Sequence, residues 1–106
     1  AEGANMPDSN EAIAFYHASH ILFAPGKASN AGGVAVSALE MSQNSMRYAW
    51  TFEEVDQKLQ GIIKNIHRQC IEAMDMYHLD AWDYTAGANL SAMQKVIDAM
   101  IAQGIY

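Results

Sequence analysis

The chain has 106 residues, of which 51% are hydrophobic and 17% charged, so it is long enough for one compact hydrophobic core. Six Lys and Arg against twelve Asp and Glu give a formal net charge of −6, which repels a phosphate backbone. No apolar run approaches the ~20 residues that a transmembrane helix needs. We therefore expect neither nucleic acid nor a membrane as a partner.

The opening residues 1–7 carry neither a basic region nor a long apolar one, so they do not form a secretory signal. Their glycine and small residues are typical of the end of a strand, and we expect the chain to begin inside a domain. Cys70 is the only cysteine, which rules out an intrachain disulfide and favours a reducing compartment. We expect a buried thiol rather than a reactive one, and a cytoplasmic protein.

Helix and strand signals alternate in the first half of the chain. Ser9 or Asn10 can cap a short helix. Its apolar residues are Ala12, Ile13, Phe15 and Tyr16. The apolar run 21–24, ended by Pro25 and Gly26, predicts a short buried strand. A helix then begins near Asn30, with apolar residues at helical spacing at Val34, Ala35, Ala38, Leu39, Met41 and Met46. A strand feeding a helix is half of a βαβ unit, whose ligands bind near the end of the strand.

The second half predicts helices. Thr51 and Glu54 form a capping box for a long amphipathic helix. Its apolar stripe comprises Val55, Leu59, Ile62, Ile63, Ile66, Cys70 and Met74. Residues 78–84 break the pattern, and a last helix runs from Leu90 until it fades at Gly104. The sequence thus predicts an α/β fold that is rich in helix and has one or two short strands.

One polar stripe is the main candidate for a binding surface. Asn30, Gly33, Val34 and Ser37 are spaced i, i+3, i+4 and i+7, so a helix that begins near Asn30 places them on one face. Glycine in a helix costs roughly 1 kcal/mol against alanine, a cost explained by the close approach of a ligand or of another backbone. The residues leave both alternatives open, a surface that faces a ligand and close packing against a neighbouring helix.

Other chemistry-bearing residues are better explained by structure. His17 and His20 are i,i+3, as are His67 and Cys70, but zinc needs four ligands and no motif supplies the others. We therefore expect no metal site. Lys27 is expected to serve on the surface or in packing. Three aromatic residues are expected to anchor a core or an interface, namely Trp50, Trp82 and Tyr84.

Two stretches closely resemble hexameric glutamate dehydrogenases of the small-subunit, NADP type. They are Ala-Glu-Gly-Ala-Asn-Met-Pro at 1–7 and Leu-Phe-Ala-Pro-Gly-Lys-Ala-Ser-Asn-Ala-Gly-Gly-Val-Ala-Val-Ser-Ala-Leu-Glu-Met at 22–41. The resemblance continues at 43–44, 86–89, 98–100 and 102–104. Ser29 and Ala38 depart from it, standing where alanine and glycine are usual. The resemblance implies that 1–50 is the C-terminal part of a Rossmann-like dinucleotide-binding domain, and that 51–106 is a helical segment that packs back toward the substrate domain.

The resemblance also assigns residues. It implies that Asn5 and Asn30 approach the nicotinamide end of the cofactor. It implies that Ser37 binds the distal carboxylate of glutamate and that Val34 lines the same pocket. The hydroxyl of Ser37 can donate a hydrogen bond to a carboxylate, which favours glutamate over apolar amino acids. The catalytic lysine and aspartate of the family would lie upstream, so we expect no catalytic residue here and no activity from this piece alone.

The expected activity of the intact protein is the interconversion of L-glutamate with 2-oxoglutarate and ammonia by a homohexamer. NADP is the expected cofactor, with NAD as the alternative, because the residues that read the ribose 2′ position would lie upstream. The competing hypothesis is a non-catalytic helical interaction module that keeps dehydrogenase-like sequence. An upstream glycine-rich fingerprint and catalytic lysines would separate the two.

Overall fold

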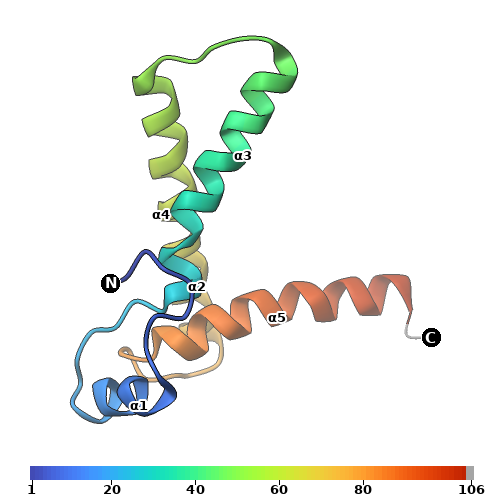
Figure 1. The fold of residues 1–106 in the computed structure, drawn as a ribbon. Coiled ribbons are helices and arrows are strands. Elements are labelled where there is room, and N and C mark those ends of the chain that lie inside the picture. Colours follow the sequence, from blue (N-terminus) through green and yellow to red (C-terminus); the bar gives the residue numbers. More distant parts are fainter. Residues whose placement is uncertain (105–106) are drawn as a thin grey trace.

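The computed structural model describes residues 1–104, and its regular structure is entirely helical. The helices are α1 (Asn10–Ala18), α2 (Gly26–Ser29), α3 (Ala31–Met46), α4 (Phe52–Met76) and α5 (Tyr84–Gln103). Figure 1 shows α3 and α4 as the two arms of a long hairpin, with α5 running across the base of α4 and α1 beside the start of α5. Residues 105 and 106, the end of the predicted 51–106 segment, lie outside the described residues.

The predicted first helix is confirmed as α1. The side chain of Ser9 accepts a hydrogen bond from the backbone N–H of Ala12 at 3.2 Å, so Ser9 is the N-cap. Tyr16 lies on the inner side of the helix, with its ring 5.4 Å from that of Phe23. Its hydroxyl donates to the Asp8 carboxylate at 3.3 Å, which ties α1 to the segment before it.

The predicted strand at 21–24 is wrong for the described chain. These residues lie outside any helix and pair with no strand within residues 1–104. Only Phe23 is buried, at 8% exposed, whereas Leu22 is 63% exposed. A strand exists only when a neighbour completes its hydrogen-bond ladder, and no segment among residues 1–104 forms such a ladder with this one. The apolar run therefore has the composition of a buried strand without the partner that would make it one.

The predicted helix from Asn30 is confirmed as α3, but a short helix precedes it. α2 begins directly after Pro25, whose φ of −61° and ψ of 134° form the N-cap. Asn30 itself is in the right-handed helical region, so α2 runs almost directly into α3. α3 ends at Met46, and its C-cap residue Arg47 takes a left-handed conformation with φ 54°. The predicted stripe of polar and small residues at 30–37 thus lies at the start of a nearly continuous helical rod.

The long amphipathic helix is confirmed as α4, including its cap. Glu54 N–H donates to the Thr51 hydroxyl at 3.2 Å, and Thr51 N–H donates to the Glu54 carboxylate at 2.7 Å. This reciprocal pair is the predicted capping box. Three side chains near the other end of the helix are buried, those of Cys70, Ala73 and Met74.

The last helix begins at Tyr84, six residues before the predicted start at Leu90. Asp83 is the N-cap, because its carboxylate accepts a hydrogen bond from Ala86 N–H at 2.9 Å. The predicted break at 78–84 is confirmed for residues 78–83, which lie outside any helix. At Gly87, α5 passes very close to α4: a Cβ there would lie 2.6 Å from Met74 Cγ and 3.0 Å from the Cys70 carbonyl. This crossing holds the small core of the molecule.

Candidate functional site

The first residues of the chain lie against the junction of α2 and α3. We call residues 2–7 the Asn5 loop. The Asn30 side chain donates through Nδ2 to the Gly3 carbonyl at 2.9 Å. The Ser29 hydroxyl donates to the carbonyl of Glu2. The structure therefore brings together the segments that carry the two predicted nicotinamide contacts, Asn5 and Asn30.

Gly26 makes this close approach possible. A Cβ at this position would lie 2.9 Å from the Ala4 carbonyl oxygen and 3.0 Å from Pro7 Cδ. It would also lie 3.2 Å from Met6 N. Two of these neighbours are backbone atoms, which cannot turn away as a flexible side chain can. Gly26 is buried under the Asn5 loop, so a side chain here would push the loop off the helix junction.

Glu2 shapes the loop from within. One carboxylate oxygen accepts hydrogen bonds from its neighbours, Gly3 N–H at 2.7 Å and Ala4 N–H at 3.2 Å. Met6 further along has a positive φ of 55°, a left-handed conformation that is uncommon for a residue other than glycine. The Glu2 carboxylate thus fixes a turn, which is a structural role rather than that of a catalytic base.

The hydrogen bond to Gly3 sets the orientation of the Asn30 amide. A carbonyl oxygen can only accept, so Nδ2 must face it and Oδ1 must point the other way. Within residues 1–104, Asn30 Oδ1 accepts no hydrogen bond. Asn30 therefore presents an acceptor at the beginning of α3, directed away from the loop. An amide N–H of a ligand, such as that of a carboxamide, matches it chemically.

The predicted stripe continues from Asn30 along α3. Gly33, Val34 and Ser37 are exposed, with Val34 at 63%. Helix α4 packs beside the stripe, because a Cβ on Gly32 would lie 3.5 Å from Ile63 Cδ1. A Cβ on Gly33 would meet no atom within 4 Å in the described chain. Close packing against α4 thus explains Gly32 but not Gly33, and the face of α3 that carries Ser37 is open.

Lys27 has a structural role here. Its ammonium donates to Asn89 Oδ1 at 2.7 Å, and this hydrogen bond connects α2 with α5. The partner Asn89 belongs to the 86–89 motif noted in the sequence. The sequence alone did not predict this contact, nor the anchoring roles of Ser29 and Gly26. Each depends on which distant segments meet.

The histidine pairs do not converge on a shared centre. His17 lies 3.7 Å from the Asp83 carboxylate through Nδ1 and 3.3 Å from the Thr85 hydroxyl through Nε2. His67 stacks on Tyr84, with ring centroids 5.7 Å apart. Among residues 1–104, no three side chains of the metal-binding types gather in one place. The histidines instead connect α1 and α4 to the start of α5.

Two tryptophans lie in local contacts. Lys58 Nζ is 4.9 Å from the centroid of the Trp50 ring, a cation–π contact at the tip of the α3–α4 hairpin. The ring of Trp82 is 6.3 Å from that of His20.

The described helices include none that is long and apolar enough to cross a bilayer.

Comparison with known proteins finds similar dehydrogenases along nearly the whole chain. The glutamate/leucine/phenylalanine/valine dehydrogenase family matches residues 1–104. NADP-specific glutamate dehydrogenase of Giardia intestinalis is 54% identical over 98% of this chain, and that of Escherichia coli is 49% identical over 99%. A solved structure of Plasmodium falciparum glutamate dehydrogenase superposes with a TM-score of 0.89 at 45% identity, covering all of this chain. The chain spans only 23% of the length of each of these proteins.

Proposed function

This chain belongs to the glutamate/leucine/phenylalanine/valine dehydrogenase family, and we propose that the protein carrying it interconverts L-glutamate with 2-oxoglutarate and ammonia, using NADP. The observation that carries the proposal is the identity of about half of all residues to enzymes named for this activity, along the whole chain. One relative of similar identity is named as NAD(P)-specific, so NAD is the alternative cofactor. The remaining length of such a protein would supply the catalytic groups.

The Asn5 loop and the start of α3 fit the nicotinamide end of the cofactor. The nicotinamide, when bound, exchanges hydride with the substrate α-carbon. The chain contributes acceptor and donor groups that would orient it. Asn30 Oδ1 points away from the loop and can accept from a carboxamide N–H. Asn5 is exposed on the loop that Asn30 holds. The roles of Asn5 and Asn30 as nicotinamide contacts are therefore compatible with their surroundings.

Ser37 and Val34 fit one wall of a glutamate pocket. Ser37 lies seven residues beyond Asn30, about 10 Å further along α3 at ~1.5 Å per residue. Its exposed hydroxyl can donate to the distal carboxylate of glutamate, while Val34 offers an apolar surface for the substrate methylenes. This spacing separates a cofactor end of the stripe from a substrate end.

The larger assembly also belongs to the proposal. Residues 1–50 would complete a Rossmann-like dinucleotide-binding domain. The segment 51–106 would pack back toward a substrate domain, within a homohexamer in the cytoplasm. The exposed apolar residues of the described helices support such covering surfaces.

Replacing Ser37 by alanine in the full-length protein tests the substrate assignment. Loss of a hydrogen bond to a charged group is worth roughly 1.5–3 kcal/mol, so kcat/KM for glutamate should fall by about 10- to 150-fold. Norvaline lacks the distal carboxylate, and its kcat/KM should change little. Steady-state kinetics with both substrates measure the difference.

Ser42→Ala is the matched control for Ser37. The Ser42 hydroxyl also lies exposed on α3, but it donates to the Ala38 carbonyl of its own helix at 2.8 Å. Its loss should leave both substrates unaffected. Equal losses for glutamate and norvaline in Ser37→Ala would show that Ser37 does not bind the carboxylate. A full-length protein without glutamate oxidation would favour the non-catalytic interaction module instead.

A further inference from the structure

We propose that Ser29 is a positioning residue for the nicotinamide contact of Asn5, acting by holding the Asn5 loop against the α2–α3 junction. The inference rests on the proposed function, since it concerns the same cofactor site. Within residues 1–104, the Ser29 side chain forms no hydrogen bond to Asn5, Val34 or Ser37, nor to the side chain of Asn30. It acts only through the backbone of the loop, to which its hydroxyl donates.

Two adjacent residues of the junction hold two consecutive carbonyls of the loop. Ser29 Oγ donates to the Glu2 carbonyl, and Asn30 Nδ2 donates to the Gly3 carbonyl at 2.9 Å. A single hydrogen bond would leave the loop free to rotate about it. Bonds to two neighbouring peptide groups fix both its position and its direction. Gly26 lets the next residue, Ala4, pass close to the helix.

Asn5 depends on these tethers for its own placement. Within residues 1–104, neither the backbone nor the side chain of Asn5 takes part in a hydrogen bond. Its position is therefore set by the residues before it, which Ser29 and Asn30 hold, and by the tight passage over Gly26. Loosening the loop at Glu2 should move Asn5 without altering its chemistry.

The Ser29 hydroxyl also has acceptors within its own helix, but it is not needed to hold that helix together. The carbonyls of Pro25 and Gly26 lie 3.3 and 3.4 Å from Ser29 Oγ within the helix. The bond to Glu2 is exposed, so water can satisfy that carbonyl when the hydroxyl is removed. Ser29→Ala should therefore release the loop while α2 and α3 remain folded.

The test is NADPH binding to the full-length protein, followed by the fluorescence of the reduced nicotinamide. Ser29→Ala should raise the Kd for NADPH by about 2- to 10-fold, the range expected for one lost neutral hydrogen bond. Ser29→Thr keeps the hydroxyl and should restore a Kd close to that of the unchanged protein. Ser42→Ala removes a hydroxyl that bonds only within α3, and should leave the Kd unchanged. The KM for glutamate should stay the same in all three variants.

A double-mutant cycle with Asn5→Ala separates positioning from a general effect on structure. If Ser29 acts through Asn5, then Ser29→Ala should weaken binding in the unchanged protein but not in the Asn5→Ala background. Equal weakening in both backgrounds, or failure of Ser29→Thr to restore binding, would overturn the positioning role of Ser29 and leave the proposed function standing. A Kd unaffected by Asn5→Ala would instead overturn the proposed nicotinamide role of Asn5, and the Ser29 inference with it.

Discussion

At the scale of single residues, the candidate site depends on Asn30, whose side-chain amide carries both a hydrogen-bond donor and an acceptor. Asn30 donates to the loop through its nitrogen and presents its oxygen in the opposite direction. The sequence could suggest a nicotinamide contact for Asn30, because this residue stands in a motif that resembles a known family. Ser29 and Gly26 stand in the same stretch, but the roles of both come from contacts with the distant Asn5 loop. In the case of Ser29, the contacted residue lies 27 positions away. Sequence spacing alone does not predict such a contact.

Cys70 illustrates a residue prediction that the structure confirms. Its side chain is 5% exposed at the α4–α5 crossing, and burial raises the pKa of the thiol. The folded protein therefore holds the thiol proton to higher pH than the unfolded chain does. Because the unfolded thiol ionises first, near pH ~8.5, the free energy of unfolding should fall as pH rises above that value.

Alkylation by iodoacetamide measures this protection. The reagent attacks the thiolate, so Cys70 in the folded chain should react at least roughly tenfold more slowly at pH ~8 than in guanidinium. The rate in the folded state should continue to rise at pH values where the unfolded thiol has already ionised. Rapid reaction of the folded chain at neutral pH would contradict a buried thiol.

At the scale of elements, the crossing of α4 and α5 depends on Gly87. Alanine at this position favours a helix intrinsically, but its Cβ would lie 2.6 Å from Met74 Cγ and 3.0 Å from the Cys70 carbonyl. We expect Gly87→Ala to destabilise the fold by about 1–3 kcal/mol, as overpacking of a core does. Urea unfolding at a fixed protein concentration, followed by far-ultraviolet circular dichroism, measures the change.

Gly61 is the matched control for Gly87. It lies within α4, where a Cβ would meet no atom within 4 Å. Gly61→Ala should stabilise the helix by up to about 1 kcal/mol, because alanine has the higher helix propensity. If both alanines stabilised the chain alike, the close approach of α5 to Met74 would be disproved.

The same scale shows why some elements could be predicted from the sequence and others could not. α1 and α4 carry side-chain caps, Ser9 and the Thr51–Glu54 box, whose signals are local. The early start of α5 was missed because the aspartates that break the apolar pattern include its N-cap, Asp83. The strand at 21–24 was wrong because pairing is not a local property. Local signals thus predicted the existence of α1, α3, α4 and α5, whereas strand pairing, which depends on a distant partner, could not be predicted from them.

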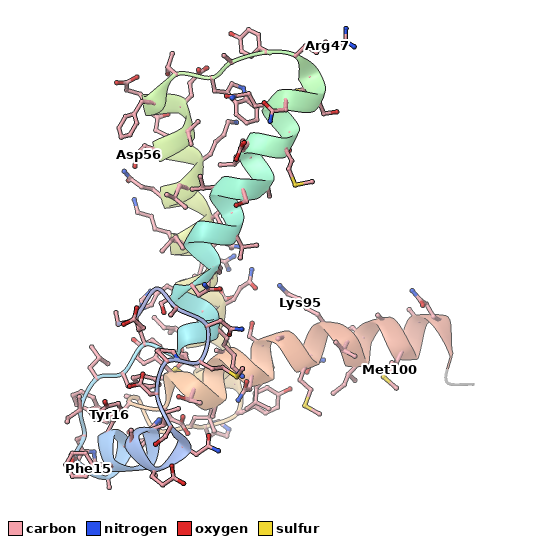
Figure 2. The ribbon with its side chains drawn as sticks, in the orientation of Figure 1. Phe15, Tyr16, Arg47, Asp56, Lys95 and Met100 are labelled. Atoms are coloured by element: carbon pink, nitrogen blue, oxygen red, sulfur yellow. The ribbon has the colours of Figure 1, made fainter. Side chains whose placement is uncertain are left out.

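At the scale of the whole molecule, the described chain is extended for its size. Its accessible surface is 7639 Å², against about 5,800 Å² for a compact protein of the same mass. Its radius of gyration is 16.4 Å, against about 13 Å for a compact domain. Many large apolar side chains are exposed on this surface. The part of α5 that carries Met100 extends away from the other helices (Figure 2), and the Met100 side chain is exposed.

This surface predicts that the chain studied alone self-associates, because large exposed apolar patches are rare on monomers. Sedimentation equilibrium at tens of micromolar should give a mass above 11.6 kDa. Val96, 58% exposed on α5, offers a direct test. Val96→Glu should shift the chain toward monomer, whereas Gln103→Glu adds the same charge on the same helix without removing an apolar side chain and should change association less. A monomer at every concentration would show that these faces do not attract one another, and equal effects of both variants would assign the association to charge rather than to apolar contact.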